Sequence, residues 1–396
     1  MKSTTSKLAS MALLVLLIAA CGGDGAGTTT AGATATTEAT GTTVSETTTS
    51  ASTETTASPD VTTGELIPLR LQLQWVTQAQ FAGYFAAVDQ GFYNDAGLDV
   101  TILEGAVDIV PQQVVAAGGA EFGIAWVPKA LVSREEGADI VNIGQVFQRS
   151  GTLEVSWADS GITEPTDWEG KRVGTWGFGN EFELTAAFEL FDVTPGEVIQ
   201  QPFDMSLLLN NELDAAQAMT YNEYAQVLEQ ENPETGELYT AADLSVIDFN
   251  EIGTAMLQDA VWADAAWLAD NEETAQAFLK ASFQGWIYCR DNPDACVQIV
   301  LDRGPALGAS HQAWQMNEIN ALIWPSPGGI GVMNPDLWEQ TVEVAVGQAV
   351  IGADPGEDAF RSDLAQAAVA ELEGEGLDVT GDSFQKATVT LNPLGE

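Results

Sequence analysis

The feature that most constrains the fold is a run, beginning at residue 69, in which short apolar strands alternate with amphipathic helices. The first strand, LRLQLQW, alternates apolar and polar side chains, and the helix after it ends near Gly97. Strands connected through helices pair in parallel, so the run predicts a mainly parallel sheet with helices on both faces. The predicted strands are 69–75, 98–105, 121–126 and 140–147, and the predicted helices are 79–93, 110–117 and 128–136.

The same alternation resumes after residue 171 and predicts a second lobe. The runs RSGTLEVSWADSGI (149–162) and GTAMLQDAVWA (253–263) are predicted to be strands that cross between the lobes. Two doubly wound α/β lobes joined by two crossing strands form a clamshell, in which ligands bind between the lobes at the carboxyl ends of strands. We expect the first lobe at 66–155, the second at 156–252, and the return to the first, with C-terminal helices and a tail, at 253–396. Further helices are predicted at 180–191, 204–213, 222–230, 272–290, 293–303, 310–322 and 335–350.

The N-terminus has the pattern of an export signal. Lys2 and Lys7 precede the apolar run Met11–Ala20, which is too short to cross a bilayer as a stable helix. The next residue, Cys21, resembles the lipidated cysteine of bacterial lipoproteins; an ordinary signal peptide with an incidental cysteine is the alternative. The stretch that follows is rich in Thr, Ala, Ser and Gly and has no apolar periodicity. We therefore predict a lipoprotein signal peptide at 1–20, a lipid anchor on Cys21 and a disordered linker over 21–65.

Acidic residues dominate the charge of the chain, with 58 Asp and Glu against 13 Lys and Arg and a formal net charge of -45 at pH 7. This balance excludes a general binder of nucleic acid or of anionic membranes, so the lipid anchor is the expected contact with a membrane. The acids are scattered along the sequence. Their distribution favours a well-hydrated surface suited to a salty or extracellular setting over an acidic binding function.

Cys289 and Cys296 flank a predicted corner between two helices, where Asn292-Pro293-Asp294 ends one helix and begins the next. An exported chain meets an oxidising environment, so these cysteines form either a local disulfide or a pair of buried thiols. The chain has a single histidine, His311, with no cysteine or second histidine at ligand spacing. No metal site is therefore predicted.

Large aromatic side chains end strands in both predicted lobes. Trp75 and Trp126 end strands of the first lobe, while Trp176 and Tyr221 end strands of the second. Flat heterocycles bind by stacking between such rings, a contribution of about 1 kcal/mol per aromatic pair beyond the area that is buried. Four rings at corresponding strand ends therefore predict a cleft for an aromatic ligand, although we expect at least one ring to fill a core instead.

Polar groups beside these rings are predicted to orient the ligand. Asn180 and Glu181 begin a helix behind Gly177 and Gly179, where free backbone N–H groups point outward. The turn lacks the GxGxxG spacing of a dinucleotide loop, and an acidic side chain disfavours a bound anion. Glu181 is better suited to accept hydrogen bonds from ring N–H, amino or hydroxyl groups. Its alternative role is to compensate the charge of the helix N-terminus.

Other polar residues are candidates by position. Asn222 and Glu223 follow Tyr221 at a helix start, and Gln148 and Asp259 lie near the two crossings. They bind hydroxyls or ring edges of the ligand, or serve as hinge and capping groups. Tyr84 also fits the buried face of the first helix, and Trp324 fits a packed loop anchor. The predicted ligand-binding residues are Trp75, Gln80, Tyr84, Trp126, Gln148, Trp176, Gly177, Gly179, Asn180, Glu181, Tyr221, Asn222, Glu223 and Asp259.

Two long segments resemble a known family. LQLQWVTQAQFAGYFAAVDQGFYNDAGLDVTILEG and DWEGKRVGTWG are similar to the openings of the two lobes in the thiamine-pyrimidine and aliphatic-sulfonate group of solute-binding proteins. The resemblance covers residues 66–350 and implies the type II periplasmic-binding-protein fold. It further implies a monomeric receptor, without cofactor or enzymatic activity, that closes over a small molecule and delivers it to the permease and ATPase of an ABC importer.

The segments QWVTQAQFAGYF, GTWGFGNEFE, AMTYNEY, AMLQDAVW and IWPSPGGIG look most similar to the riboflavin-binding branch of that family. Trp176 and Gly177 are shared with the pyrimidine receptors, but the continuation GFGNEFE departs from their pattern. The resemblance therefore favours riboflavin as the ligand, with a formylaminopyrimidine or an aliphatic sulfonate as alternatives. Binding of FMN would require Arg149, Lys171 or Arg172 to face the cleft.

Two alternatives belong to other functional classes. Eukaryotic thiamine-pyrimidine synthases resemble this fold, but they need a reactive histidine and a cysteine-rich motif. Here His311 is predicted in a late helical region away from the strand ends, and no nucleophile and base are arranged together. A sensory co-receptor would bind the same ligand without feeding a transporter. Neighbouring permease and ATPase genes would favour import, and a kinase or cyclase gene would favour sensing.

Overall fold

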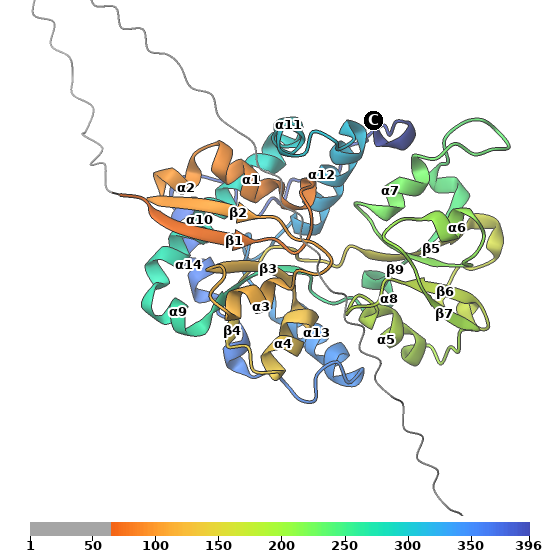
Figure 1. Cartoon of the computed structure of the whole chain (residues 1–396), viewed down its shortest axis with the longest axis horizontal. Helices are drawn as coiled ribbons and strands as arrows, with labels where there is room; N and C mark the ends of the chain where they lie inside the picture. Colours follow the sequence, from red (N-terminus) through yellow and green to blue (C-terminus); the bar gives the residue numbers. More distant parts are fainter. Residues whose placement is uncertain (1–64) are drawn as a thin grey trace, which may run out of the picture. The chain divides into compact units, whose positions relative to one another are not determined.

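The computed structural model describes residues 65–396, which belong to one compact unit. The predicted signal peptide, Cys21 and all but the last residue of the predicted linker lie outside the described residues. The strands of the described part form two groups, one in each of two lobes (Figure 1). Within residues 65–396 no helix combines the length and the apolar character needed to span a membrane.

The sheet of the first lobe has the strand order β2-β1-β3-β10-β4. β1 pairs in parallel with β2 and β3, because helices connect these strands as the sequence pattern predicts. β10 is antiparallel to both of its neighbours, since the chain reaches it from the other lobe. The strands are β1 (Ile67–Gln72), β2 (Leu98–Leu103), β3 (Phe122–Trp126), β4 (Ile140–Gln145) and β10 (Asp259–Asp264).

Helices cover both faces of this sheet (Figure 1). On one face α1 packs closely against α10, because Gly83 and Gly285 meet there: a Cβ on Gly285 would lie 2.0 Å from the carbonyl oxygen of Gly83. On the other face α3, α4 and α13 pack around Trp262. The helices are α1 (Ala82–Asp89), α2 (Phe92–Asp95), α3 (Pro111–Ala116), α4 (Val127–Glu135), α9 (Ala265–Asp270), α10 (Glu272–Asp291), α11 (Pro293–Arg303), α12 (Ala309–Ile323), α13 (Pro335–Gly347) and α14 (Asp363–Gly374).

The second lobe repeats the strand arrangement of the first in a smaller form. β5 is antiparallel to β8 and β9, and β6 is parallel to β7. A parallel bridge between Val173 and Ala215 joins the two sets and gives the order β7-β6-β8-β5-β9. The elements are β5 (Thr152–Trp157), β6 (Arg172–Thr175), α5 (Phe182–Leu190), β7 (Glu197–Gln200), α6 (Ser206–Leu209), β8 (Ala216–Met219), α7 (Glu223–Leu228), β9 (Leu244–Asp248) and α8 (Phe249–Ile252).

The chain passes between the lobes in two connections, 146–151 and 253–258, which are not strands. The prediction of continuous crossing strands is wrong in this respect, because side chains satisfy the backbone here. The side chain of Gln258 accepts a hydrogen bond from the Gly151 N–H at 2.8 Å, and that of Asn250 accepts one from the Ser150 N–H at 3.1 Å. We propose that the lobes divide within these connections, slightly before the predicted boundary at 155/156.

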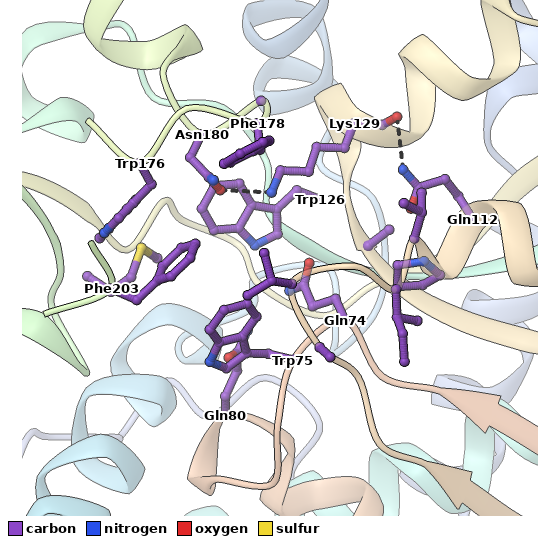
Figure 2. Close-up of a pocket in the computed structure, with 18 of the residues that line it drawn as sticks. Gln74, Trp75, Gln80, Gln112, Trp126, Lys129, Trp176, Phe178, Asn180 and Phe203 are labelled. Atoms are coloured by element: carbon purple, nitrogen blue, oxygen red, sulfur yellow. Dashed lines mark hydrogen bonds between the residues drawn. The ribbon is translucent and has the colours of Figure 1, made fainter. Parts of the chain in front are cut away.

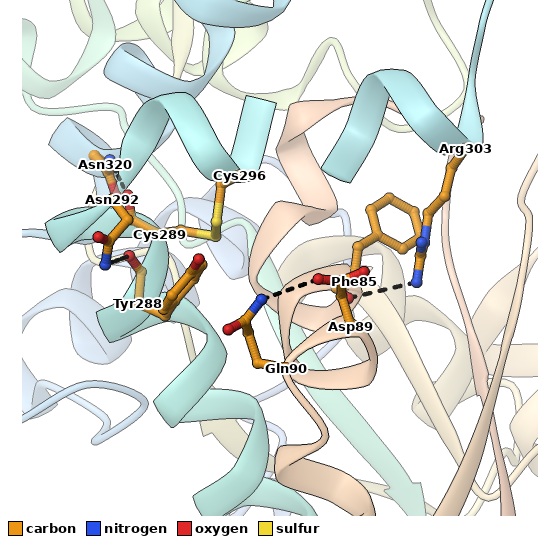
Figure 3. Close-up of a disulfide and its surroundings, with 9 residues drawn as sticks. All are labelled: Phe85, Asp89, Gln90, Tyr288, Cys289, Asn292, Cys296, Arg303 and Asn320. Carbon is orange, nitrogen blue, oxygen red and sulfur yellow. Dashed lines mark hydrogen bonds between the residues drawn. A yellow bond between two sulfur atoms is a disulfide. The ribbon is translucent and has the colours of Figure 1, made fainter. Parts of the chain in front are cut away.

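The C-terminal helices place a disulfide at the corner between α10 and α11. Cys289 and Cys296 are bonded there, with their Cα atoms 5.4 Å apart (Figure 3). Both cysteines are fully buried in the first core. The bond therefore closes the Asn292-Pro293 corner, where α10 ends and α11 begins.

α12 and the chain after α14 contact both lobes. The indole N–H of Trp314, on α12, donates to the carbonyl oxygen of Thr220 in the second lobe at 2.9 Å. The final residues then follow α12: Ala387 exchanges hydrogen bonds with the side chain of Asn317, and the Leu394 N–H donates to the Glu229 carbonyl at 3.1 Å. Both elements thus link the lobes in addition to the two connections of the chain.

Candidate ligand-binding site

A cavity of about 480 Å³ lies between the lobes, where the carboxyl ends of their strands meet. The four aromatic residues predicted from the sequence all line it: Trp75 and Trp126 from the first lobe, Trp176 and Tyr221 from the second. Figure 2 shows the three tryptophans around the cavity. Trp126 is the last residue of β3, and the other three follow β1, β6 and β8 within three residues. Strand ends therefore set the positions of the four rings, and aromatic side chains of both lobes face the cavity.

Phe203 adds a ring that the sequence did not indicate. It lies in the loop after β7, with its centroid 4.9 Å from that of Trp75 and 6.4 Å from that of Trp176, to which it is nearly parallel. Phe203 therefore contacts aromatic side chains of both lobes (Figure 2). Its place beyond a strand end, like that of the other rings, is the signal that would have identified it.

The turn after Trp176 has a constrained backbone. Gly177, Phe178 and Gly179 all have positive φ, at 71°, 55° and 85°. This region is unfavourable for phenylalanine, and such conformations concentrate at functional sites. Phe178 lines the cavity although its side chain is 72% exposed. Gly179 brings the turn against the first lobe, since a Cβ there would lie 3.3 Å from Cγ of Lys129.

Asp259 lies behind the first-lobe side of the cavity and binds three side chains that line it. Its carboxylate, only 2% exposed, accepts hydrogen bonds from Gln74 at 2.5 Å, Gln80 at 2.9 Å and the indole N–H of Trp126 at 2.9 Å. Burial raises the pKa of Asp259 to about 6, although these three donors and the charge of Lys129 oppose the shift. Asp259 is not itself in the cavity lining, whereas its three donors are. It therefore positions the groups that face a ligand.

Lys129 contributes a cation to the cavity wall. It comes from α4, its Nζ donates to Oδ1 of Asn180 at 2.8 Å, and it lies 4.7 Å above the ring of Trp126. Burial lowers the pKa of Lys129 to about 8, while Glu181 and Asp259 act in the opposite direction. The sequence did not identify this residue, because a lone lysine in PKALVSREE looks like part of an exposed helix.

Asn222 and Glu223, both predicted, line the cavity from the second lobe. Glu223 accepts hydrogen bonds from the Met219 N–H at 3.0 Å and from the Asn222 amide at 2.7 Å, and burial raises its pKa. The oxygen of Asn222 lies 2.9 Å from Nε2 of His311, whose Nδ1 lies 2.7 Å from Glu229. The prediction that His311 lies far from the strand ends is therefore wrong. α12 carries it directly behind the cavity wall.

Some predicted residues lie outside the cavity. Tyr84 is buried in α1 with its ring against Trp286, 5.5 Å between centroids, and Gln148 donates to the carbonyl of Gln145 at 2.7 Å in the first connection. Glu181 accepts from the Gly179 N–H at 2.8 Å, within the turn that follows Gly177. The cavity lining does not include Tyr84, Gln148, Gly177 or Glu181. It does include the predicted Gln80, Gly179 and Asn180.

The basic residues considered for a phosphate also lie elsewhere. Arg149 donates to backbone carbonyls, among them that of Pro325 at 3.1 Å, and Arg172 forms an ion pair with Asp214 at 2.7 Å. Neither they nor Lys171 line the cavity. No group of three or more His, Cys, Asp or Glu residues within 65–396 is arranged to hold a metal ion.

A model of the NMT1/THI5-like family matches residues 78–296 of the chain. The chain belongs to this family. This NMT1/THI5-like chain is similar to the formylaminopyrimidine-binding protein of Halalkalibacterium halodurans. The two are 22% identical over 282 residues, and the alignment covers 69% of this chain and 83% of the relative. The chain is 24% identical over 292 residues to the riboflavin-binding protein RibY of Chloroflexus aurantiacus, which covers 69% and 78%.

A further relative of this NMT1/THI5-like protein is an enzyme by name. It is the 4-amino-5-hydroxymethyl-2-methylpyrimidine phosphate synthase of Aspergillus parasiticus, 21% identical over 59% of this chain and 70% of the relative. Among solved structures, the aliphatic sulphonate binding protein SsuA of Escherichia coli matches with a TM-score of 0.52 and 15% identity, covering 82% of this chain and 92% of that one. The predicted family resemblance and periplasmic-binding-protein fold are thereby confirmed.

Proposed function

We propose that this protein is the exported receptor of an ABC importer and that its ligand is riboflavin. The observation that carries the proposal is the cavity between the lobes, whose aromatic rings come from both sides: Trp75 and Trp126 from one lobe, Trp176 and Phe203 from the other. Such a wall suits a flat heteroaromatic ring, because stacking adds about 1 kcal/mol per pair to the burial of apolar area. A relative whose name includes riboflavin binding supports the choice of ligand.

The geometry also supports capture by closure. Ligand binds to one lobe, the connections 146–151 and 253–258 bend, and the second lobe covers the exposed face of the ring. The closed form is then recognised by the permease, which works with an ATPase. We propose that the receptor is monomeric and that Cys21, after export, anchors it by lipid at the end of its linker.

The two alternative ligands suit the cavity less well. An aliphatic sulfonate has no ring for the aromatic wall, and the carboxyl group of Glu223 in the lining disfavours an anion on that side. A formylaminopyrimidine has a single ring, whereas the rings of Trp75, Trp126 and Trp176 line a larger surface. It remains the second candidate, because a relative is named for binding it.

We propose that the protein performs no reaction, although a relative is named as a synthase. The cavity lining contains no histidine and no cysteine. His311 lies behind Asn222 with both ring nitrogens engaged, and Cys289 and Cys296 are bonded to each other. The lining therefore holds neither the histidine nor the cysteine that a synthase of this kind would use.

Riboflavin titration of the full chain in mild detergent tests the proposal. We expect saturable quenching of both flavin and tryptophan fluorescence, because stacked rings lie within contact distance. Trp176→Ala is expected to weaken binding roughly 10-fold, the loss of about 1.4 kcal/mol. Trp338→Ala, on α13 outside the cavity lining, is the matched control and should bind as the natural chain does. If riboflavin causes no quenching and a formylaminopyrimidine or an alkanesulfonate raises the melting temperature instead, the ligand is that compound and not riboflavin.

A further inference from the structure

Lys129 lies in the cavity wall without a carboxylate partner. Seven of the eleven Lys and Arg side chains within residues 65–396, among them Arg70, Arg172 and Lys280, form ion pairs with Asp or Glu. Among the described residues Lys129 forms none, in a chain with 58 acidic residues. Burial lowers its pKa to about 8, so its ammonium group has lost much of its hydration. A cation in such a place needs another polar group to replace the lost water.

The hydrogen bonds around Lys129 leave donors for a ligand. An ammonium group has three N–H donors, and the one protein acceptor within reach is Oδ1 of Asn180 at 2.8 Å. The amide of Asn180 is fixed in turn, since its Nδ2 donates to the carbonyl of Gly177 at 2.7 Å. Two donors of Lys129 therefore remain at the cavity wall, beside the face of Trp126 (Figure 2).

The acids that face Lys129 keep it protonated but are bound to other groups. Asp259, from β10, accepts from Gln74, Gln80 and Trp126. Glu181, at the start of α5, accepts from the Gly179 N–H, and Glu223 of the lining accepts from Met219 and Asn222. Asp259 and Glu181 offset only part of the effect of burial on the pKa of Lys129, and none of the three carboxylates forms an ion pair with it.

We propose that Lys129 selects the ligand by donating to an oxygen atom, carbonyl or anionic, at the edge of a ring stacked on Trp126. This inference rests on the proposed function and narrows its ligand class. The dione edge of a flavin presents two such carbonyl oxygens. The amino group of an aminopyrimidine, placed at the same point, would set donor against donor, and the unsatisfied donors would weaken binding.

Replacement of Lys129 by methionine in the full chain tests the proposal. Methionine keeps much of the apolar stem, so K129M is expected to fold and to lose only the donors. A hydrogen bond from a charged donor implies roughly a 10- to 100-fold loss of riboflavin affinity. K171M removes a lysine outside the cavity lining and should change affinity less than about twofold. K129R restores charged donors and should recover part of the affinity.

The pH dependence separates this role from simple packing. Because the pKa of Lys129 is about 8 without ligand, riboflavin affinity should fall as pH rises from about 7 to about 9. K129M should lose this dependence, whereas K171M should keep it. Equal affinity and equal pH profiles for the natural chain and K129M would overturn the inference while leaving riboflavin as the ligand.

Small aromatic probes test Lys129 independently of riboflavin. Three naphthalene compounds are compared by the thermal shift that each produces. 2-Naphthoate presents an anionic oxygen, its neutral methyl ester a carbonyl oxygen, and 2-naphthylmethylamine a cation. We expect stabilisation by the first two, absent in K129M, and none by the amine. If the acid and the ester stabilise the protein but riboflavin does not bind, the proposed ligand is wrong and the role of Lys129 stands. If the amine stabilises the protein, or if none of the three compounds does, the role of Lys129 is wrong. Stronger dependence on Lys129 for the acid than for the ester would identify an anionic oxygen as its partner.

Discussion

Trp126 is held in one orientation by contacts on three sides. Its indole N–H donates to Asp259, Lys129 lies above its face, and β3 fixes its backbone. An aromatic ring held in this way loses little conformational entropy when a ligand stacks on it, so more of the stacking energy appears as affinity. The buried carboxylate is thus part of the binding site although it does not line the cavity.

Replacing Asp259 with asparagine should weaken ligand binding without unfolding the protein. The variant keeps the shape of the side chain, but its amide nitrogen meets the donors of Gln74 or Gln80 and so breaks part of the network. We expect roughly a 10-fold loss of affinity, measured by fluorescence titration. Asp270→Asn, exposed at the end of α9, is the control. Unchanged affinity in Asp259→Asn would remove Asp259 from the site.

At the scale of single residues the sequence identified the bulky rings and several polar residues, among them Asp259 and Asn180, but it missed Lys129. Trp126 and Trp176 could be predicted because large aromatics at strand ends are uncommon enough to carry information. Lys129 and Phe178 could not, because their roles depend on a lobe-to-lobe contact that no local pattern encodes. Tyr84 was misplaced because both faces of α1 are buried, so its periodicity does not distinguish cavity from core.

Among the elements, α5 connects the second lobe to the hinge through Glu183. This buried side chain accepts a hydrogen bond from the Met256 N–H at 2.6 Å in the second connection, while its other oxygen has no partner among the described residues. Burial raises the pKa of Glu183 from 4.5 to about 7. The folded state therefore holds this proton more tightly than the unfolded state does.

Glu183 should make the protein less stable as pH rises. Because its pKa is higher in the folded state, its contribution is present in full below about pH 4.5 and is lost as pH rises through about 7, a change of about 3 kcal/mol. Glu183→Gln keeps an acceptor for Met256 and should flatten this part of the pH profile in denaturant unfolding. Glu251→Gln, exposed on α8, should not. Parallel profiles for Glu183→Gln and the natural chain would contradict the assignment.

Elements with strong periodicity were predictable, and those shaped by tertiary contacts were not. α11 and α12 begin and end within one residue of their predicted bounds; Pro293 marks the start of α11, and Gly304 follows its end. The predicted helix 79–93 is instead divided at Gly91, whose positive φ ends α1 before α2 begins. α14 was not predicted, because its run of alanines and acids contains few large apolar residues. In the structure it nevertheless packs in the core of the first lobe.

The whole molecule is a pair of related lobes under strong self-repulsion. Both sheets place an antiparallel strand, β10 or β5, fourth in the same order, and in each case this is the strand that follows a crossing. The formal net charge of -45 belongs to the entire chain and not to one patch of its sequence. Repulsion of this kind opposes any compact state and is weakened by dissolved ions.

The melting temperature should therefore rise with salt at neutral pH. Between about 0.01 M and 0.15 M salt the screening length falls from about 30 Å to about 8 Å, so most of the increase should occur in this range. Differential scanning calorimetry with potassium chloride and with potassium glutamate separates screening from binding of a particular anion. A melting temperature that does not change, or that falls, would show that repulsion between the acidic residues does not destabilise the folded protein at low salt.

The position of His311 has a practical consequence for following the receptor at work. It is the one histidine in the sequence, and its ring nitrogens lie against Asn222 of the cavity wall and Glu229, the residue that follows α7. Its imidazole resonances therefore need no assignment strategy. In a spectrum of the ¹⁵N-enriched natural chain, the imidazole peaks of His311 report whether the second lobe has moved against α12, with no fluorophore attached and no residue replaced.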